Sequence, residues 1–329
     1  MIALSLLVIS SIIGAGFATG AELLAFFGGS SVSPIITAGL FGVFLFLLMA
    51  IIVYLVNCKF NPPTYIFVPI YFAFFVALTA GMVALIGIFP TIVALCLCIV
   101  LVVFGFDKLM RLNTLIIGFV IVVLLWTVMG SFELGSSSFM LPSFGLLGSA
   151  LFYAGMNCML FPVIKAGRDR FSFRKVLGAC GIACGVLTVL VFLMLSSIDP
   201  NSSNPMPILD IADNIFVKAA IFLSIFSSQF ISLFNLDSSV RLKQKTTPSD
   251  NRKLSHKKFR VVKLVVISVV GFGFSLIGFQ TLVGTLYPLV GIFMTLFLLC
   301  AFVICWTHRR ILLRRNSPDQ APEISSPPT

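Results

Sequence analysis

Long apolar runs, separated by short polar segments and by glycine or proline, follow one another along the whole chain. Because about 20 apolar residues cross the hydrocarbon core of a bilayer, this pattern predicts about ten membrane-spanning helices. Merging the third and fourth spans, which Pro90 separates, would leave about nine. The predicted spans cover residues 3–27, 33–57, 65–87, 90–105, 110–131, 144–165, 174–198, 215–236, 261–280 and 283–306.

The composition excludes a soluble domain, since 59% of the 329 residues are apolar and only 10% are charged. The eight cysteines lie within or beside apolar runs and form no disulfide framework. Cys180 and Cys184 share a helical face, but no histidine or carboxylate accompanies them. We therefore interpret them as packing residues and expect no metal site. The chain is predicted to be an all-α polytopic membrane protein in contact with the lipid bilayer.

The basic residues predict the orientation of the helices. With the N-terminus in the cytoplasm, Lys218 is the only one of the 22 Lys and Arg residues that falls outside. This predicts an integral protein of the cell (inner) membrane with both termini cytoplasmic. The net charge of +11 then reflects topology, and we expect no nucleic-acid partner. The basic segment 241–260 is interpreted as a solvated loop or as a contact for anionic lipid, and residues 307–329 as a disordered cytoplasmic tail.

The first span contains an interruption, Ile13-Gly-Ala-Gly-Phe-Ala-Thr-Gly-Ala-Glu22. Small residues at the spacing of Gly16 and Gly20 are also typical of close helix packing. However, packing does not require a carboxylate such as Glu22, which is costly at this depth in a membrane. A helix that unwinds here would expose backbone groups able to hold a solute or an ion.

A second interruption occurs in the sixth span, where polar and glycine residues stand in an apolar run that includes Tyr153, Gly155 and Asn157. Two halves of five spans would have opposite orientations, as in inverted-repeat transporters. We therefore predict a first five-helix repeat over residues 1–131 and a second over 144–306, with the first helix of each half broken.

The eighth span adds a polar stripe at three- and four-residue steps, made of Ser224, Ser227, Ser228, Ser232 and Asn235. A stripe of this length favours a face turned to a wet cavity, although single serines often bond to their own helix. Serine hydroxyls and freed carbonyls are oxygen ligands of the type that hard cations take.

The first interruption resembles the GAGFASGQE signature of the YkvI-like membrane proteins, and Tyr153-Ala-Gly-Met-Asn157 is similar to the tyrosine-and-asparagine break of that family. Thr19 and Ala21 stand where the family usually has serine and glutamine. The family is thought to belong to the amino acid–polyamine–organocation transporter superfamily. The resemblance implies the inverted-repeat fold named for the bacterial leucine transporter. It also implies solute or ion contacts at Gly14, Gly16 and Thr19, and an ion site at Ser224, Ser227 and Ser228.

These features predict an ion-coupled secondary transporter of a small polar solute, an amino acid or a related amine. The solute site would include Gly14, Gly16, Thr19, Glu22, Tyr153, Gly155 and Asn157. Sodium or protons would drive it, since the chain has no nucleotide-binding motif, and no cofactor or enzymatic activity is expected. The alternative is a non-transporting sensing or assembly protein on the same scaffold. The sequence leaves the oligomeric state open.

Overall fold

The computed structural model describes residues 2–28, 33–60, 62, 64–104, 106–131, 143–159, 164, 171–202, 204–239 and 250–315. Within them, all regular secondary structure is helical. The elements are α1 (Ile2–Ile12), α2 (Ala15–Thr19), α3 (Ala21–Phe27), α4 (Pro34–Asn57), the 3-10 helix η1 (Thr64–Phe67), α5 (Val68–Ile86), α6 (Ile88–Phe104), α7 (Phe106–Gly130), α8 (Phe144–Met156), α10 (Phe173–Ser197), α11 (Ile208–Ile211), α12 (Ile215–Ser239), α13 (Asp250–Ser275) and α14 (Phe279–Arg315).

Seven of the ten predicted spans each coincide with one helix of the described chain. The first span covers α1, α2 and α3, and the third covers η1 and α5. The sixth, predicted over 144–165, coincides with α8 only as far as Met156. Five helices, α4, α5, α10, α12 and α14, are long and apolar enough to cross a membrane by themselves, and shorter apolar helices lie in α6, α7 and α8. The nine-span alternative is wrong. Gly87, with φ of 84°, separates α5 from α6 in a backbone conformation that glycine adopts without strain.

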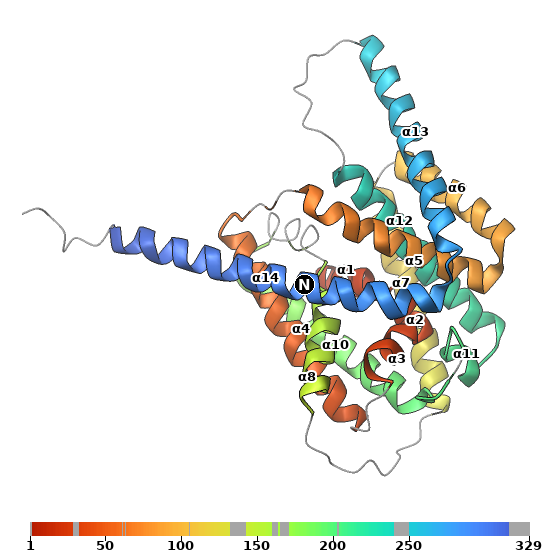
Figure 1. Cartoon of the computed structure of the whole chain (residues 1–329), viewed down its shortest axis with the longest axis horizontal. Helices are drawn as coiled ribbons and strands as arrows, with labels where there is room; N and C mark the ends of the chain where they lie inside the picture. The colour runs from red at the N-terminus through yellow and green to blue at the C-terminus, as the bar shows by residue number, and fades with distance from the viewer. Residues whose placement is uncertain are drawn as a thin grey trace, which may run out of the picture.

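Two boundaries differ from the sequence prediction. Helix α13 begins at Asp250 and α14 continues to Arg315, so residues 250–260 are not loop and 307–315 are not a disordered tail. Neither stretch contains proline or glycine, so nothing in the backbone ends the helix, and charge alone made them look like loops. Both helices project beyond the bundle (Figure 1). Residues 241–249 and 316–329 lie outside the described residues.

The pieces of the first span lie at the centre of the bundle. Helix α1 contacts α7 and α10, α2 contacts α5 and α12, and α3 contacts α8 and α14. Ile13, Phe17 and Leu23 are accordingly fully buried. By contrast, α13 and α14 keep exposed apolar faces, including Val269 and Leu296, as expected of surfaces that meet lipid.

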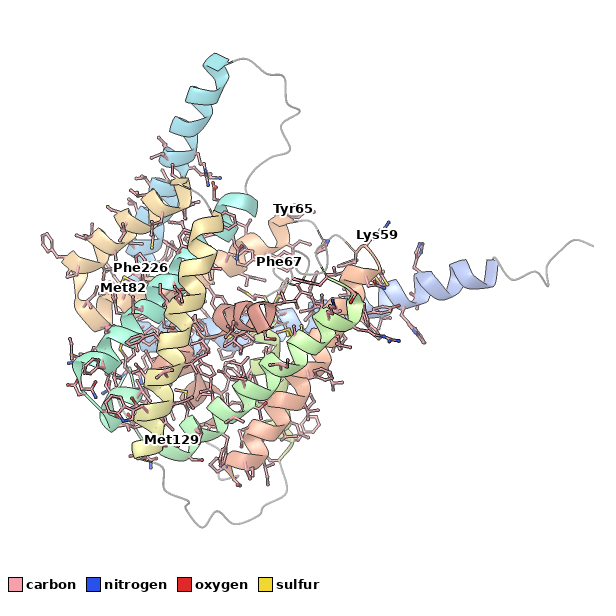
Figure 2. All side chains as sticks on the ribbon, turned by 180° about the vertical axis from the view of Figure 1, so that it is seen from behind. Lys59, Tyr65, Phe67, Met82, Met129 and Phe226 are labelled. Atoms are coloured by element: carbon pink, nitrogen blue, oxygen red, sulfur yellow. The ribbon has the colours of Figure 1, made fainter. Side chains whose placement is uncertain are left out.

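A buried ion cluster lies near one end of α12. Lys59, just after α4, and Met129, near the end of α7, lie at opposite ends (Figure 2). The ion cluster joins the end of α12 to α13, where Asp237 Oδ2 accepts from Arg260 Nε at 2.8 Å and Asp237 Oδ1 lies 2.8 Å from Lys263 Nζ. Arg260 Nη2 also donates to the Val102 carbonyl of α6 at 2.9 Å. This cluster therefore ties three helices together.

We expect Asp237→Asn to lower stability strongly, because it leaves Arg260 and Lys263 largely buried without their counter-charge. Breaking a buried ion pair in this way typically costs about 3–5 kcal/mol. The readout is the melting temperature in detergent. Asp213→Asn is the matched control, since its 2.6 Å pair with Lys218 is exposed and should contribute little. Equal melting temperatures of the two variants would contradict the prediction.

Candidate functional site

The first interruption lies between α1 and α2 and takes the Ile13 carbonyl out of the helical ladder. Ile13 N still donates to Ile9 O, whereas Gly14 N turns back to Ile12 O at 2.8 Å. Helix α2 then begins at Ala15, and Ala18 N bonds the Gly14 carbonyl. The Ile13 carbonyl thus lies where the helical ladder has been broken.

Helix α12 supplies partners for these carbonyls. Ser224 Oγ lies 3.2 Å from both the Ile13 and Gly14 carbonyl oxygens, and Ser228 Oγ lies 3.4 Å from that of Ile13. Two carbonyls and two hydroxyls therefore converge from elements more than 200 residues apart in sequence. Ser227 is also buried, and in sequence it lies between the two serines whose hydroxyls reach the break, Ser224 and Ser228. These four oxygens match the ligands that a monovalent hard cation prefers.

The polar stripe of α12 is divided between two neighbours. Ser224 and Ser228 face the break, whereas Ser232 donates to the Tyr71 carbonyl of α5 at 2.9 Å. Gln229 also faces α5, where its amide donates to Thr79 Oγ1 at 2.8 Å. The predicted polar stripe therefore does not face one environment, because it contacts both the first interruption and α5.

The first span has a further break, which lies between α2 and α3. Gly20 has φ of 78°, a left-handed conformation that only glycine adopts easily. Thr19 Oγ1 donates to the Gly16 carbonyl at 3.1 Å and accepts from Ala21 N at 3.4 Å. The hydroxyl of Thr19, predicted to bind solute or ion, thus pairs backbone groups at the break itself.

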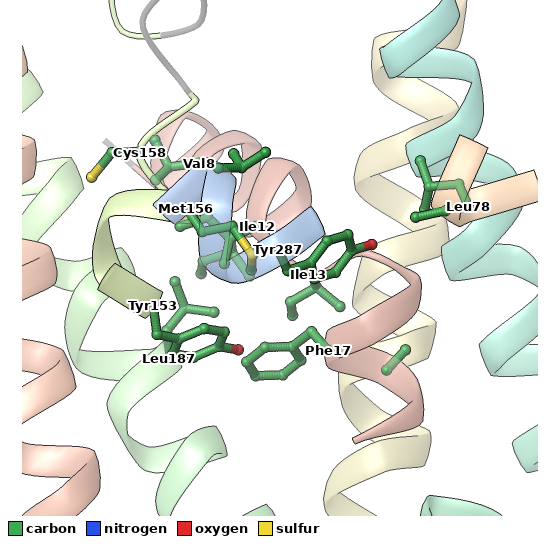
Figure 3. Close-up of a cluster of buried hydrophobic side chains, with 14 of the residues drawn as sticks. Val8, Ile12, Ile13, Phe17, Leu78, Tyr153, Met156, Cys158, Leu187 and Tyr287 are labelled. Carbon is green, nitrogen blue, oxygen red and sulfur yellow. The ribbon is translucent and has the colours of Figure 1, made fainter. Parts of the chain in front are cut away.

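Glu22 is the buried carboxylate of the site, with 3% of its surface exposed. Its Oε2 accepts from the Tyr153 hydroxyl of α8 at 3.3 Å, and a backbone hydrogen bond joins it to Phe17. In Figure 3 the Tyr153 hydroxyl points toward the segment that carries Phe17. The Glu22 side chain occupies the space that a Cβ on Gly16 would need. Among the described residues, no ion pair includes Glu22.

Aromatic rings fix Tyr153 from several sides. Its ring centroid lies 5.0 Å from that of Phe26, 5.5 Å from Phe27 and 4.8 Å from Phe41. Tyr287 of α14 is a further buried phenol near Glu22, and its ring stacks on Phe74 at 4.9 Å. The carboxylate thus lies among aromatic groups contributed by several helices.

Two further residues predicted at the solute site, Gly155 and Asn157, lie at the end of α8. Asn157 follows the last residue of α8, and its Nδ2 donates to the Tyr153 carbonyl at 2.8 Å. Gly155 faces α14, where a Cβ would meet Thr295 Oγ1 and the Gly291 carbonyl. The structure therefore places Gly155 at a packing contact and does not bring it to Glu22. Helix α8 runs unbroken through its glycines and ends only at Met156.

Sequence reasoning missed three contributors to this region. The Ile13 carbonyl has no side-chain signature, because the accepting oxygen belongs to the backbone. Tyr287 lies in an apolar run, where a single tyrosine is ordinarily interpreted as a packing residue. Gln229 could have been noticed, since an amide within an apolar span needs a partner.

Comparison with known proteins defines the class of fold. No protein-family model matches the chain, and no curated protein matches it in sequence. The structure is similar to the crystal structure of the Eremococcus coleocola manganese transporter in complex with an aromatic bis-isothiourea substituted compound. The TM-score is 0.50 at 15% identity, and the match covers 91% of this chain and 77% of that chain. The chain is therefore an all-α polytopic membrane protein with a transporter-type fold.

We predict that Gly16→Ala lowers the melting temperature, because the new methyl group must displace the Glu22 side chain from a buried position. In a Glu22→Ala background the same substitution should cost much less, since the displaced side chain is gone. Gly39→Ala is the control, because a Cβ there meets nothing within 4 Å. Additive effects of the Gly16 and Glu22 substitutions would show that the two residues do not contact each other.

Proposed function

We propose that this protein is an ion-coupled secondary transporter of a small polar solute, an amino acid or a related amine. The observation that carries the proposal is the interruption of the first span. It brings the backbone oxygens of Ile13 and Gly14 to the α12 hydroxyls, and it aligns Glu22 with Tyr153 of α8. Broken helices at the centre of a bundle are the usual means by which transporters build a site at membrane depth.

The proposed ion site lies between α1, α2 and α12. Its ligands would be the Ile13 and Gly14 carbonyls with the Ser224 and Ser228 hydroxyls, and the negative end of the α1 dipole points at the same place. All four of these cation ligands would be neutral oxygens. They therefore suit a monovalent cation such as sodium, which does not require several carboxylates.

The proposed solute site lies on the other side of α2, at Glu22 and Tyr153. A buried carboxylate without a protein cation can serve as the counter-charge of an ammonium group or can carry a proton. The amides and carbonyls beside Gly16 and Gly20 add neutral donors and acceptors. The structural neighbour is a manganese transporter. Here, however, one carboxylate faces the site, whereas divalent cations favour several oxygen ligands, often carboxylates.

Helix contacts support the proposed five-plus-five inverted repeat. In this repeat the first span (α1–α3), α4, α5, α6 and α7 correspond in order to α8, α10, α12, α13 and α14. When each helix is replaced by its counterpart, the contact of α4 with α8 becomes that of α10 with α1, which the structure also has. The contact of α7 with α12 becomes that of α14 with α5, and α6 with α12 becomes α13 with α5. In three further contacts, α4 with α10, α5 with α12 and α6 with α13, a helix meets its own counterpart, so the replacement leaves the contact unchanged. This is the pattern expected of two halves related by a two-fold axis in the membrane.

The same repeat agrees with the resemblance to the YkvI-like proteins and the leucine-transporter fold. The basic cluster of Arg260 and Lys263 favours a cytoplasmic position for the start of α13. The segment between α10 and α12 would then face the outside, and both termini the cytoplasm.

Sodium should stabilise the wild-type protein more than potassium at equal ionic strength. A ligand at about 100-fold excess over its dissociation constant adds about 2.7 kcal/mol to the stability of the folded state. We expect Ser224→Ala to remove this sodium-specific rise in melting temperature. Ser232→Ala should keep it, because Ser232 lies on the same helix but bonds the Tyr71 carbonyl. A sodium response retained in Ser224→Ala would remove the proposed ion site.

Glu22→Gln should abolish solute uptake into proteoliposomes or make it independent of pH, because the amide keeps the size of the side chain but not its charge. Tyr153→Phe keeps the aromatic packing and removes the 3.3 Å bond, so we expect a smaller loss. The measurement is uptake of radiolabelled amino acids and amines across a pH gradient. Wild-type-like, pH-dependent uptake by Glu22→Gln would refute the role of Glu22. Binding without uptake by the wild-type protein would favour the sensing or assembly alternative.

A further inference from the structure

A cavity of about 330 Å³ lies beside α3 and is separate from the Glu22–Tyr153 contact. Its walls are one face of α3, the segment from Pro200 to Pro207, and the first turns of α14. The volume is at the small end of the range of ligand pockets, which suits a small solute.

Helix α3 forms a partition one helix thick between this cavity and Glu22. Ala21, Leu24 and Ala25 line the cavity on one face. Glu22 and Leu23 are buried on the other face. A solute in the cavity would therefore need only a displacement of α3 to reach the carboxylate, and the left-handed Gly20 provides a hinge at the start of that helix.

The wall contributed by α14 presents backbone and side-chain acceptors. Gln280 and Gly284, one turn apart, both line the cavity. Pro288 lies within α14 and has no N–H, so the Gly284 carbonyl lacks the donor that a regular helix would supply. This carbonyl and the Gln280 carboxamide can accept hydrogen bonds from an ammonium group.

Hydrogen bonds hold the wall segment from Pro200 to Pro207 in a defined conformation. Asp210 accepts from the Ser202 hydroxyl and, at 2.6 Å, from Asn204 Nδ2, while Asn204 Oδ1 accepts from Met206 N at 3.0 Å. Ile198 and Pro207 flank the Gly20 hinge. Asp210 is exposed and adds negative charge beside the opening, whereas the described residues that line the cavity are uncharged. A solute with an ammonium group and no net negative charge fits this environment.

We propose that this cavity is a binding site for the ammonium group of a small amino acid or amine, occupied before the solute reaches Glu22. The inference rests on the proposed transport function and adds a second solute site to it. The Gly284 carbonyl and Gln280 bind the ammonium group, and α3 separates the two sites.

The test is ligand protection of a cysteine in the cavity. Ala25→Cys places a thiol on the cavity face of α3, and its labelling by a methanethiosulfonate is measured in nanodiscs, where both faces are accessible. Unsubstituted protein gives the background from its eight cysteines. Neutral amino acids and ethanolamine, each added alone, are compared with lactate, which lacks the ammonium group. We expect protection by at least one amine and none by lactate, in both wild-type and Glu22→Gln backgrounds.

Three variants separate binding from folding. Gly284→Leu fills the cavity and should abolish protection, whereas Gly273→Leu on α13 should not, and a Cβ meets nothing within 4 Å at either position. Pro288→Ala restores the missing helical donor, so it should weaken protection several-fold without lowering the melting temperature. Protection that vanishes in Glu22→Gln would place the only site at Glu22 and overturn the inference while leaving the proposed function intact. No labelling, no protection, or protection by lactate alone would also overturn it.

Discussion

Inside a bilayer every backbone polar group needs a partner from the protein, and this requirement governs the centre of the molecule. The first span breaks its own ladder at the Ile13 carbonyl, and Ser224 and Ser228 of α12 supply the hydrogen bonds that the helix no longer provides there. At the second break, Thr19 does the same within the segment. The position of α12 against α1 and α2 is thus fixed by polar contacts, whereas most of the other helices meet through apolar packing.

Small residues have two different uses in this bundle. Gly155 and Gly291 allow α8 and α14 to approach until each glycine lies against the backbone of the other helix, as in tightly packed membrane helices. Gly16 instead leaves room for a side chain of its own segment, that of Glu22, and Gly20 supplies a backbone conformation. The spacing of Gly16 and Gly20 therefore looks like a packing motif, although neither residue serves to join two long helices.

Much of the helix layout could be predicted from the sequence, because apolar length and basic loops reflect the bilayer directly. The sequence could predict that Glu22 and Tyr153 belong to one site. It could not predict their hydrogen bond, because that contact depends on how α3 and α8 pack. The close contact of Gly155 with α14 could not be anticipated, because glycine in an interrupted span has the same signature in packing and in binding. Charged helix ends such as Asp250–Arg260 were mistaken for loop because hydropathy measures burial and not helicity. The cavity beside α3 involves segments far apart in the chain, and no local pattern marks it.

The hydrogen bond between Tyr153 and Glu22 also has an energetic consequence. It joins a side chain of α3 to one of α8, the two elements that frame the centre of the bundle. Any cation that takes the carboxylate as its partner competes with the phenol for the same oxygens. Binding of the cation to Glu22 and loss of the Tyr153 hydrogen bond are then thermodynamically linked. Part of the binding free energy is used to shift the helices from one arrangement to another, and the observed affinity is lower by that amount. Replacing Tyr153 by phenylalanine should therefore tighten equilibrium binding even while it slows turnover.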